Sequence, residues 1–505
     1  MASFRALLPL TGASLLAACN FAPGYVRPTG AVPAALPTDG IYPRAASDAP
    51  DVTRVGWRDF FTDARLRAVI ARSLDDNRDL RIAAGNVLQA RERYRIQRAN
   101  QLPVVGISAD GTATNNAFGG GSGATSGTTT GNGSTGTGGN GQQPGGGSNR
   151  QLYSLNAGVS SFELDLFGRV RNLSRAALEQ YFATEEAQRA TRISLIAETA
   201  TAWLQLAADQ DQLTLSRRTL AAFASTRELT QAQFRIGVAS ELEARQADTN
   251  YQAAVNDIAV AETRIAQDRN ALELLVGAPV EAALLPAGLG TDEATLVFLP
   301  AGVPSSVLLR RPDVLQAEHG LIAQNFNIGA ARAARFPTIS LTATAGTISS
   351  ALTGLFSGGS FTYSAGPSLT TALFEGGRTR AGVRLAYADR AVALSTYERA
   401  IQVAFREVAD ALAQRGTIDR QLAAQTARAR SAEVAARLSD ARYRVGVSSF
   451  LNTLDAQRTA YAAEQQLVTT RFTRGGNLVE LYRALGGGLD NDLLPTRANG
   501  VASPP

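Results

Sequence analysis

The sequence predicts a mixed α/β membrane protein built from one structural unit that occurs twice. Three observations support this prediction: an export signal that ends at a single cysteine, an internal repeat, and paired alternating strands between long helical stretches. The chain has 505 residues, 45% hydrophobic and 18% charged, so it can bury a sizeable core. Beyond the N-terminal signal, no segment offers the about 18 consecutive apolar residues of a transmembrane helix. A membrane crossing is therefore expected to use a closed β-barrel.

The first 18 residues are predicted to be a secretory signal peptide. Arg5 supplies a short positive region, and a mostly apolar stretch follows it. The stretch ends in Leu16-Ala17-Ala18-Cys19, which resembles the bacterial lipobox. That resemblance implies that Cys19 becomes a lipidated N-terminus and that residues 19–61 form a lipidated segment. By the same resemblance to sorted lipoproteins, Asn20 after the cysteine favours the outer membrane. The alternative is a signal peptide that happens to contain a buried cysteine.

Charge and composition exclude several classes of function. The net charge is +5, all 49 basic residues are arginine, and acids alternate with them, as in Arg91-Glu92-Arg93. This pattern is typical of solvated helix surfaces, whereas a nucleic-acid binder gathers its arginines on one face. His319 and Cys19 are the sole histidine and cysteine, so a catalytic triad or a zinc site lacks residues. We expect no enzyme, no metal and no cofactor, and a structural or surface role for His319.

The chain repeats itself over a long distance. Phe-Arg-Ile-Gly-Val-Ala-Ser at 234–240 returns as Tyr-Arg-Val-Gly-Val-Ser-Ser at 443–449, a shift of 209 residues. Gly168-Arg169 returns as Gly377-Arg378 at the same shift. Earlier in each half the shift is 234, because Leu102-Pro103 corresponds to Phe336-Pro337. We treat the 209-residue pairing as firm and the early pairing as approximate.

Each half contains the same elements in the same order. The first repeat, 62–285, has a helix at about 62–101, a β-hairpin at 103–165 and a long helical hairpin. A Pro/Gly-punctuated linker, 286–312, leads to the second repeat. That repeat, 313–485, has a helix, a β-hairpin at 337–374 and another long helical hairpin, and the tail 486–505 is expected to be disordered. Proline ends the first helix of each half because it cannot continue a helix.

The strand predictions rest on alternation with a period of two residues. Ile339, Leu341 and Ala343 alternate with serine and threonine, and segments at 153–160 and 361–365 behave similarly. One apolar and one polar face suits a barrel with lipid outside and water inside, although a half-buried soluble sheet would show the same pattern. Four strands cannot close a membrane barrel, since the smallest barrels have eight. Several identical chains would therefore have to pool their strands.

With these features in place, the sequence resembles the TolC/OprM family of outer-membrane efflux proteins, in its lipoprotein branch that works with RND-type pumps. The resemblance covers nearly the whole mature chain. Five short motifs carry it, in order: Tyr25-Val26-Arg27-Pro28, Trp57-Arg58-Asp59-Phe60-Phe61, Phe162 to Gly168, Leu309-Arg310-Arg311-Pro312-Asp313, and Tyr443-Arg444-Val445-Gly446 followed by Leu454 to Arg458.

The family implies a homotrimer whose twelve strands form an outer-membrane β-barrel continuous with a long periplasmic α-helical barrel. It also implies two protein partners, a periplasmic adaptor and an inner-membrane RND transporter, and no catalysis. The duct would export small molecules. Two rival functions remain: a type I protein-secretion duct, which the lipobox disfavours, and a periplasmic coiled-coil scaffold without a pore.

The resemblance further implies a gate and a docking surface at the periplasmic tips. The residues that match the gate are Tyr443, Leu451, Asp455 and Arg458, with Leu451 as an apolar constriction. Asp455 would need a countercharge from Arg458 or Arg444, and opening would break such contacts. An ordinary surface pair between positions i and i+3 of one helix is the alternative for the two charged residues. The expected adaptor contacts are the Gly-centred turns at Gly237, Val238, Gly446 and Val447.

Overall fold

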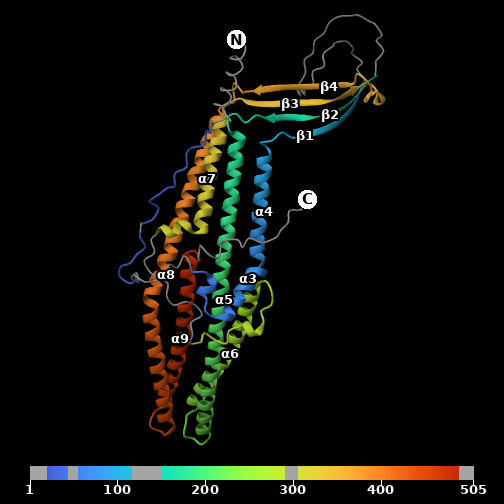
Figure 1. Cartoon of the computed structure of the whole chain (residues 1–505). Helices are drawn as coiled ribbons and strands as arrows, with labels where there is room; N and C mark the ends of the chain where they lie inside the picture. Colours follow the sequence, from blue (N-terminus) through green and yellow to red (C-terminus); the bar gives the residue numbers. More distant parts are fainter. Residues whose placement is uncertain (1–19, 34, 44–54, 116–148, 291–304, 488–505) are drawn as a thin grey trace, which may run out of the picture. The chain divides into compact units, whose positions relative to one another are not determined.

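The computed structural model describes residues 20–33, 35–43, 55–115, 149–290 and 305–487 (Figure 1). The predicted signal peptide, Cys19, the Gly/Ser/Thr-rich tract at 119–148 and most of the tail lie outside the described residues. The chain divides into two compact units, one around the strands and one around the long helices. None of the described helices combines the length and apolarity needed to span a membrane.

The first unit holds one four-stranded antiparallel sheet in the order β1 (Val105–Asn115), β2 (Asn149–Glu163), β3 (Thr338–Ser349) and β4 (Phe361–Thr370). The prediction of four strands per chain is confirmed. Strands β2 and β3 pair although about 190 residues separate them, so the two repeats meet through this ladder. A bulge between Val159 and Phe162 bends β2, and Ser161 there has a φ of 53°.

Aromatic stacking closes the junction between sheet and helices in this unit. The Phe336 ring lies between two others, with centroid distances of 4.9 Å to Phe21 and 4.7 Å to Phe167. The carboxylate of Asp165 accepts hydrogen bonds from the backbone N–H of Val170 and Arg171, at 3.2 and 2.7 Å. These bonds satisfy donors that the first turn of a helix leaves without partners. The connection between β2 and the helix that begins at Arg169 is thereby stabilised by hydrogen bonds between neighbouring residues.

The long helices confirm the repeat in detail. α5 (Arg169–Arg235) and α8 (Arg378–Arg444) have 67 residues each and start 209 residues apart. They are followed by α6 (Glu241–Val276) and α9 (Phe450–Ala484). α4 (Arg78–Ala99) and α7 (Pro312–Ala333) have 22 residues each and start 234 residues apart. The early pairing therefore holds residue by residue, and the first half is longer mainly because 33 residues separate β1 from β2.

Two expected boundaries differ from the structure. The helical stretch at 62–101 is broken into α3 (Ala64–Asp76) and α4, because the Asn77 side chain accepts the backbone N–H of Leu80 and caps α4. Its amide also donates to the backbone carbonyl of Leu275 at 2.8 Å. The expected linker at 286–312 ends in the 3₁₀ helix η3 (Ser305–Arg310), and Pro312 opens α7, where a missing N–H costs nothing.

The largest core of the second unit gathers around the Trp57–Phe61 motif. The side chains of Trp57, Phe60 and Phe61 are fully buried, on and just after the short helix α2 (Trp57–Phe60). Phe60 stacks on Tyr482 with a centroid distance of 4.2 Å, and Phe61 meets the same ring edge-on at 6.1 Å. This motif therefore joins the N-terminal segment to the end of α9.

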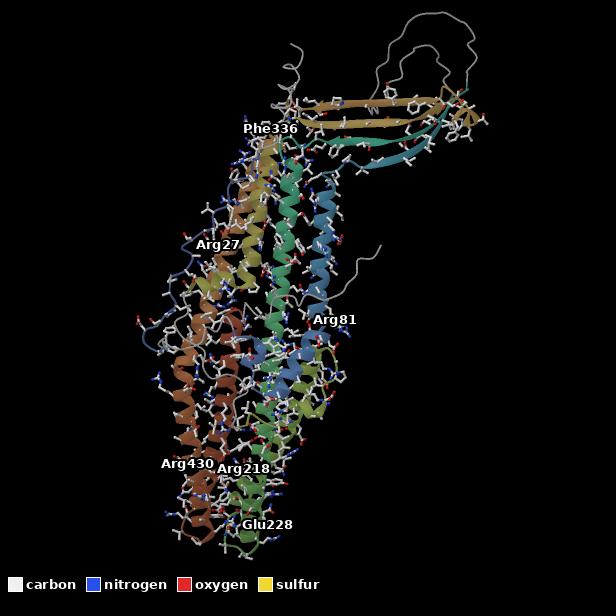
Figure 2. All side chains as sticks on the ribbon, in the orientation of Figure 1. Arg27, Arg81, Arg218, Glu228, Phe336 and Arg430 are labelled. Atoms are coloured by element: carbon white, nitrogen blue, oxygen red, sulfur yellow. The ribbon has the colours of Figure 1, made fainter. Side chains whose placement is uncertain are left out.

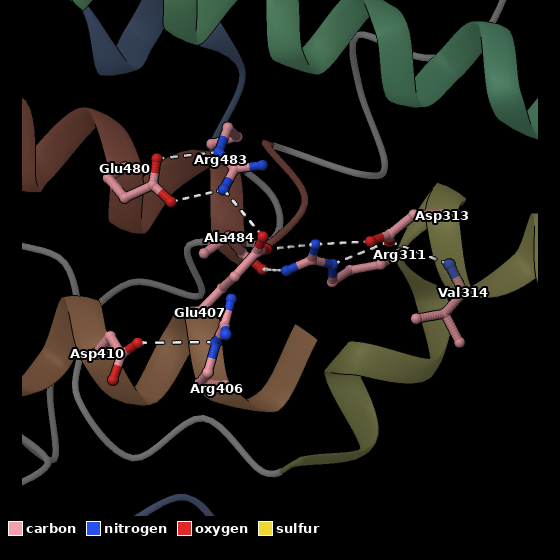
Figure 3. Close-up of polar contacts among 9 residues, drawn as sticks. All are labelled: Arg311, Asp313, Val314, Arg406, Glu407, Asp410, Glu480, Arg483 and Ala484. Carbon is pink, nitrogen blue, oxygen red and sulfur yellow. Dashed lines mark hydrogen bonds and ion pairs between the residues drawn. The ribbon is translucent and has the colours of Figure 1, made fainter. Parts of the chain in front are cut away.

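A buried arginine ties the start of the second repeat to the middle of α8 and to the end of α9 (Figure 3). The Arg311 guanidinium donates to the Ala484 carbonyl at 2.6 Å, to Asp313 at 2.7 Å and to Glu407 at 2.8 Å. Glu407 also pairs with Arg483 at 3.2 Å. Because every charge here has a partner, the network can be buried without an isolated ion.

Candidate functional site at the helical hairpin tips

Each long helical hairpin turns at a glycine. Gly237 and Gly446 have φ values of 79° and 78°, a region that side chains with a Cβ rarely adopt. The backbone N–H of Val238 donates to the Gln233 carbonyl at 2.9 Å, and that of Val447 donates to Arg442 at 2.9 Å. These bonds between residues five apart define the same C-terminal turn motif in both hairpins. The two tips are therefore copies of one local structure.

The tips present apolar side chains to solvent. In each turn an exposed β-branched residue lies on either side of the glycine, isoleucine and valine in the first hairpin and two valines in the second. An exposed leucine follows in the return helix. The exposed residues are Ile236, Val238 and Leu242 in the first hairpin, and Val445, Val447 and Leu451 in the second. Soluble proteins rarely leave such clustered apolar groups uncovered, so these tips have the character of a protein-docking surface. Gly237, Val238, Gly446 and Val447, where adaptor contacts are expected from the sequence, are all exposed.

The predicted gate residue Tyr443 is buried, not exposed. Its ring packs near Phe450 at a centroid distance of 5.7 Å, in a small core with Ala247 and Leu454. Its hydroxyl donates to the Gln233 side chain of α5 at 2.6 Å. Tyr443 therefore joins the second hairpin to the first, a contact that sequence reasoning did not supply.

The other three predicted gate residues lie on the exposed surface of α9. Leu451, Asp455 and Arg458 are all exposed. Within the described part of the chain, neither Asp455 nor Arg458 forms an ion pair, so the ordinary surface pair between these two residues is absent. Arg444, the other candidate countercharge, is held by Asp440 at 2.7 Å. The four residues therefore separate into one buried and three exposed positions.

Further polar contacts join the two hairpins above the tips. Gln457 donates to the Thr226 hydroxyl at 3.0 Å, and the Tyr461 hydroxyl bonds to Asp257 at 2.9 Å. Burial and that carboxylate raise the pKa of Tyr461, and Arg218 pairs with Glu464. Sequence reasoning missed these residues, because a polar side chain on a helix does not reveal which distant helix it faces.

The N-terminal motif Tyr25-Val26-Arg27-Pro28 also has a clear role. Arg27, labelled in Figure 2, binds the Glu318 carboxylate through two nitrogens at 2.7 Å each. Tyr25 donates to the same carboxylate at 2.8 Å. Glu318 is buried in α7, so this bidentate pair neutralises it. Burial and Glu318 raise the pKa of the Tyr25 hydroxyl. The segment that follows Cys19 is thereby fastened to the second repeat.

His319, for which the sequence predicts a structural or surface role, forms a hydrogen bond within the helical unit. Its Nδ1 lies 2.7 Å from a carboxylate oxygen of Glu179 on α5, and its ring is 5.5 Å from that of Phe182. The hydrogen bond to Glu179 raises the pKa of His319 above its usual value of 6.5. Among the described residues, no group of three or more histidine, cysteine, aspartate or glutamate side chains could hold a metal ion.

This histidine makes stability depend on pH. A raised pKa in the folded chain means that the protonated pair stabilises it fully below pH 6.5, and that this contribution is lost as pH rises through the folded value. We expect His319→Gln to lower stability by roughly 1 kcal/mol at pH 6 and by less at pH 9. Heat denaturation of both proteins at both pH values checks this. Burial and Asp209 raise the pKa of Asp268 to about 7, so this group also makes stability depend on pH. Because Asp268 is present in both proteins, the difference in stability between them at each pH reports on His319. An equal effect at both pH values would contradict the assignment.

The comparisons with known proteins agree with this architecture. The family model "Outer membrane efflux protein" matches residues 69–278 and 303–487, so it covers most of both halves. The chain belongs to the outer membrane efflux protein family.

Similar proteins cover the chain almost completely. The solvent efflux pump outer membrane protein SrpC of Pseudomonas putida is 39% identical over 482 residues, 95% of this chain and 98% of that protein. The outer membrane protein OprJ of Pseudomonas aeruginosa is 39% identical over 490 residues, covering 94% of each chain. Among solved structures, the open-state MtrE channel of Neisseria gonorrhoeae has a TM-score of 0.79 at 37% identity, covering 93% of this chain and 99% of that one.

Proposed function

We propose that this protein is the outer-membrane exit duct of a tripartite RND-type efflux system and exports small molecules. Three copies would form a twelve-stranded β-barrel continuous with a periplasmic helical barrel. A periplasmic adaptor and an inner-membrane RND transporter would be its partners. Cys19 would carry the lipid anchor. The protein itself would catalyse nothing, because transport through an open duct breaks no bond.

One observation carries this proposal: among the described side chains of the four-stranded sheet, none is buried. Every residue of β4 is exposed, including Phe361, Tyr363 and Leu369, and Ile107 of β1 is exposed as well. A half-buried soluble sheet would hide one of its faces. Exposed apolar residues on one side and serine or threonine on the other suit a lipid-facing and a water-facing surface. Three chains of four strands give twelve, enough to close a barrel.

The hairpin tips support the choice of partner. The exposed Val238 and Val447 each follow a glycine with positive φ in the same type of turn, so each chain has two similar apolar surfaces at the tips. Two similar apolar surfaces per chain suit a ring-shaped partner that contacts both repeats of each copy. A scaffold without a pore does not need exposed apolar residues on both the sheet and the tips.

From the hydrogen bonds between the two hairpins we infer which contacts would break when such a duct opens. The Tyr443–Gln233 bond and the Gln457–Thr226 bond both join α5 to the second hairpin. Moving the second hairpin outward would break them, each at a net cost of about 1 kcal/mol. In the closed ring, Asp455 side chains from three copies would approach the axis and need countercharges from Arg458 or Arg444 of a neighbour. Leu451 would narrow the same opening.

We expect Asp455→Ala to increase leakage through the closed duct. Removing the carboxylate would remove the countercharge contact that holds the tips together, so single-channel conductance in planar lipid bilayers should rise. Asp410→Ala is a matched control, because Asp410 is an exposed acid of α8 whose nearest arginine nitrogen is 3.9 Å away. Equal conductance of the Asp455 variant and the unmodified protein would count against the gate. Absence of any conductance from the unmodified protein would count against the duct itself.

A further inference from the structure

A pocket lies at the end of the sheet where β3 begins and β4 ends. Its volume is about 830 Å³, and its lining includes the paired residues Thr338 and Thr370. All the residues that line it belong to the first unit. Three exposed arginines are among them: Arg335 between α7 and β3, and Arg378 and Arg380 in the first turn of α8. Positive charge therefore gathers at this end of the sheet.

The three arginines have no carboxylate partner. In the part of the chain that the structure describes, none of them forms an ion pair, whereas a fourth arginine of the lining, Arg169, pairs with Glu163 at 2.5 Å. Glu375 also lines the pocket and offsets one of the three charges. The described residues of the unit include ten arginines and four acidic residues, whereas the whole chain has a net charge of +5. The excess positive charge of the chain therefore lies in this unit.

In the first repeat, carboxylates occupy the corresponding positions. At the shift of 209 residues, Glu163, which holds Arg169, corresponds to Ala372. Asp165, which accepts the first backbone N–H groups of α5, corresponds to Phe374. The second repeat keeps the arginine and has neither carboxylate. An anion from outside the chain can therefore fill the role that two side chains fill in the first repeat.

The same pocket carries two large apolar side chains. Leu373 and Phe374 are 98% and 91% exposed, and both belong to the lining. A small inorganic anion would leave these side chains in water. A ligand with a phosphate group and hydrocarbon chains would bind the arginines and also remove apolar surface from water, which is favourable. The pocket therefore matches an amphiphile better than a free anion.

The lipid anchor expected at Cys19 would place a membrane surface near this pocket. Phe21 stacks on Phe336, which lines the pocket next to Arg335, and the Phe21 carbonyl accepts a hydrogen bond from Arg332 at 3.0 Å. Cys19 lies outside the described residues, but two residues of chain span at most roughly 7 Å. Acyl chains on Cys19 would therefore enter the membrane close to the pocket.

We propose that this pocket binds the headgroup of an anionic phospholipid. Arg335, Arg378 and Arg380 hold the phosphate, because guanidinium groups match the geometry of phosphate oxygens. Leu373 and Phe374 contact the acyl chains. The excess of positive charge favours a headgroup with a net negative charge, such as that of phosphatidylglycerol, over the zwitterionic phosphatidylcholine. The inference rests on the proposed function, which places the sheet in the outer membrane, and it adds a preferred lipid and its binding site.

Native mass spectrometry of the full-length protein in a neutral detergent tests this proposal. The protein is titrated with phosphatidylglycerol and, separately, with phosphatidylcholine, and bound lipids are counted from the mass. We expect tighter binding of phosphatidylglycerol. Arg378→Gln combined with Arg380→Gln should lower that affinity about 25-fold, at about fivefold for each arginine. Glu375→Gln should raise it about fivefold, because a like charge is removed.

Arg430→Gln is the matched control. Arg430, labelled in Figure 2, is another exposed arginine of α8 that forms no ion pair with any described residue, and it belongs to the second unit. Its replacement removes the same charge and should leave the affinity unchanged. The opposite sign of the Glu375 effect cannot come from misfolding, which would weaken binding in every variant.

Equal affinity for the two lipids would overturn the proposal, as would an unchanged affinity in the double arginine variant or an equal loss in the Arg430 variant. Displacement of phosphatidylglycerol by inorganic phosphate would assign the pocket to a free anion instead. Single-channel conductance in phosphatidylcholine bilayers separates this site from the duct. A conducting protein without lipid preference would overturn the lipid site alone, whereas a protein that binds phosphatidylglycerol as expected but never conducts would contradict the duct alone.

Discussion

Replacing Arg311 with methionine is expected to destabilise the helical unit by about 3–5 kcal/mol, because Glu407 and the Ala484 carbonyl would lose a buried partner. Arg311 makes contacts with three acceptors, and its side chain is almost fully buried. The methionine fills a similar volume, so lost charge pairing and not a cavity would dominate. The midpoint of guanidinium unfolding in detergent, followed by circular dichroism, measures the change.

A control lies next to Glu407 on α8. Arg406 pairs with Asp410 at 3.9 Å, and both side chains are largely exposed (Figure 3). Arg406→Met should therefore change stability by less than about 1 kcal/mol. Arg311→Lys should fall between the two, since lysine keeps the charge but cannot reach three acceptors with a planar fork. If the Arg311 and Arg406 variants unfolded at the same denaturant concentration, the network would have no special role.

Phe60→Ala should cost about 3–5 kcal/mol, as expected for an aromatic ring removed from a closed core. Phe60 is fully buried and stacks on Tyr482 at 4.2 Å, so its loss would free the N-terminal segment from the end of α9. The same unfolding measurement applies, and limited proteolysis should cut the N-terminal segment sooner. Phe356→Ala, at an exposed position, should change stability by less than about 0.5 kcal/mol. Comparable stability of the two alanine variants would show that the core forms without the Phe60 ring.

Local sequence signals predicted the repeat, the four strands and the long helices. In the strands polar and apolar residues alternate, and the long helices contain no proline, so a few consecutive residues are enough to recognise each kind of element. The glycines at the two hairpin tips were also predictable, because a turn with positive φ favours glycine. The break at Asn77 was missed. Asparagine occurs inside helices as well as at their N-caps, and besides its local cap on Leu80 this side chain bonds to the Leu275 carbonyl, 198 residues away, a contact that the sequence does not reveal.

The candidate site shows the same limit more strongly. The sequence identified Tyr443, Leu451, Asp455 and Arg458 by resemblance, but it could not distinguish the buried tyrosine from the three exposed residues. That distinction depends on which face of α8 meets α5, where the Gln233 side chain accepts from Tyr443. The partners Thr226 and Asp257 escaped notice for the same reason. Polar residues are common on every helix surface, so only their spatial neighbours mark them.

The sequence by itself determined the family, the duplicated order of elements and the turns, because periodicity, proline positions and glycine turns act over a few residues. Only the tertiary structure decided which charges are buried, how the repeats meet between β2 and β3, and which apolar residues find no cover. Those properties depend on contacts between residues that lie far apart along the chain. Arg311 illustrates this, since its partners Glu407 and Ala484 are 96 and 173 residues away.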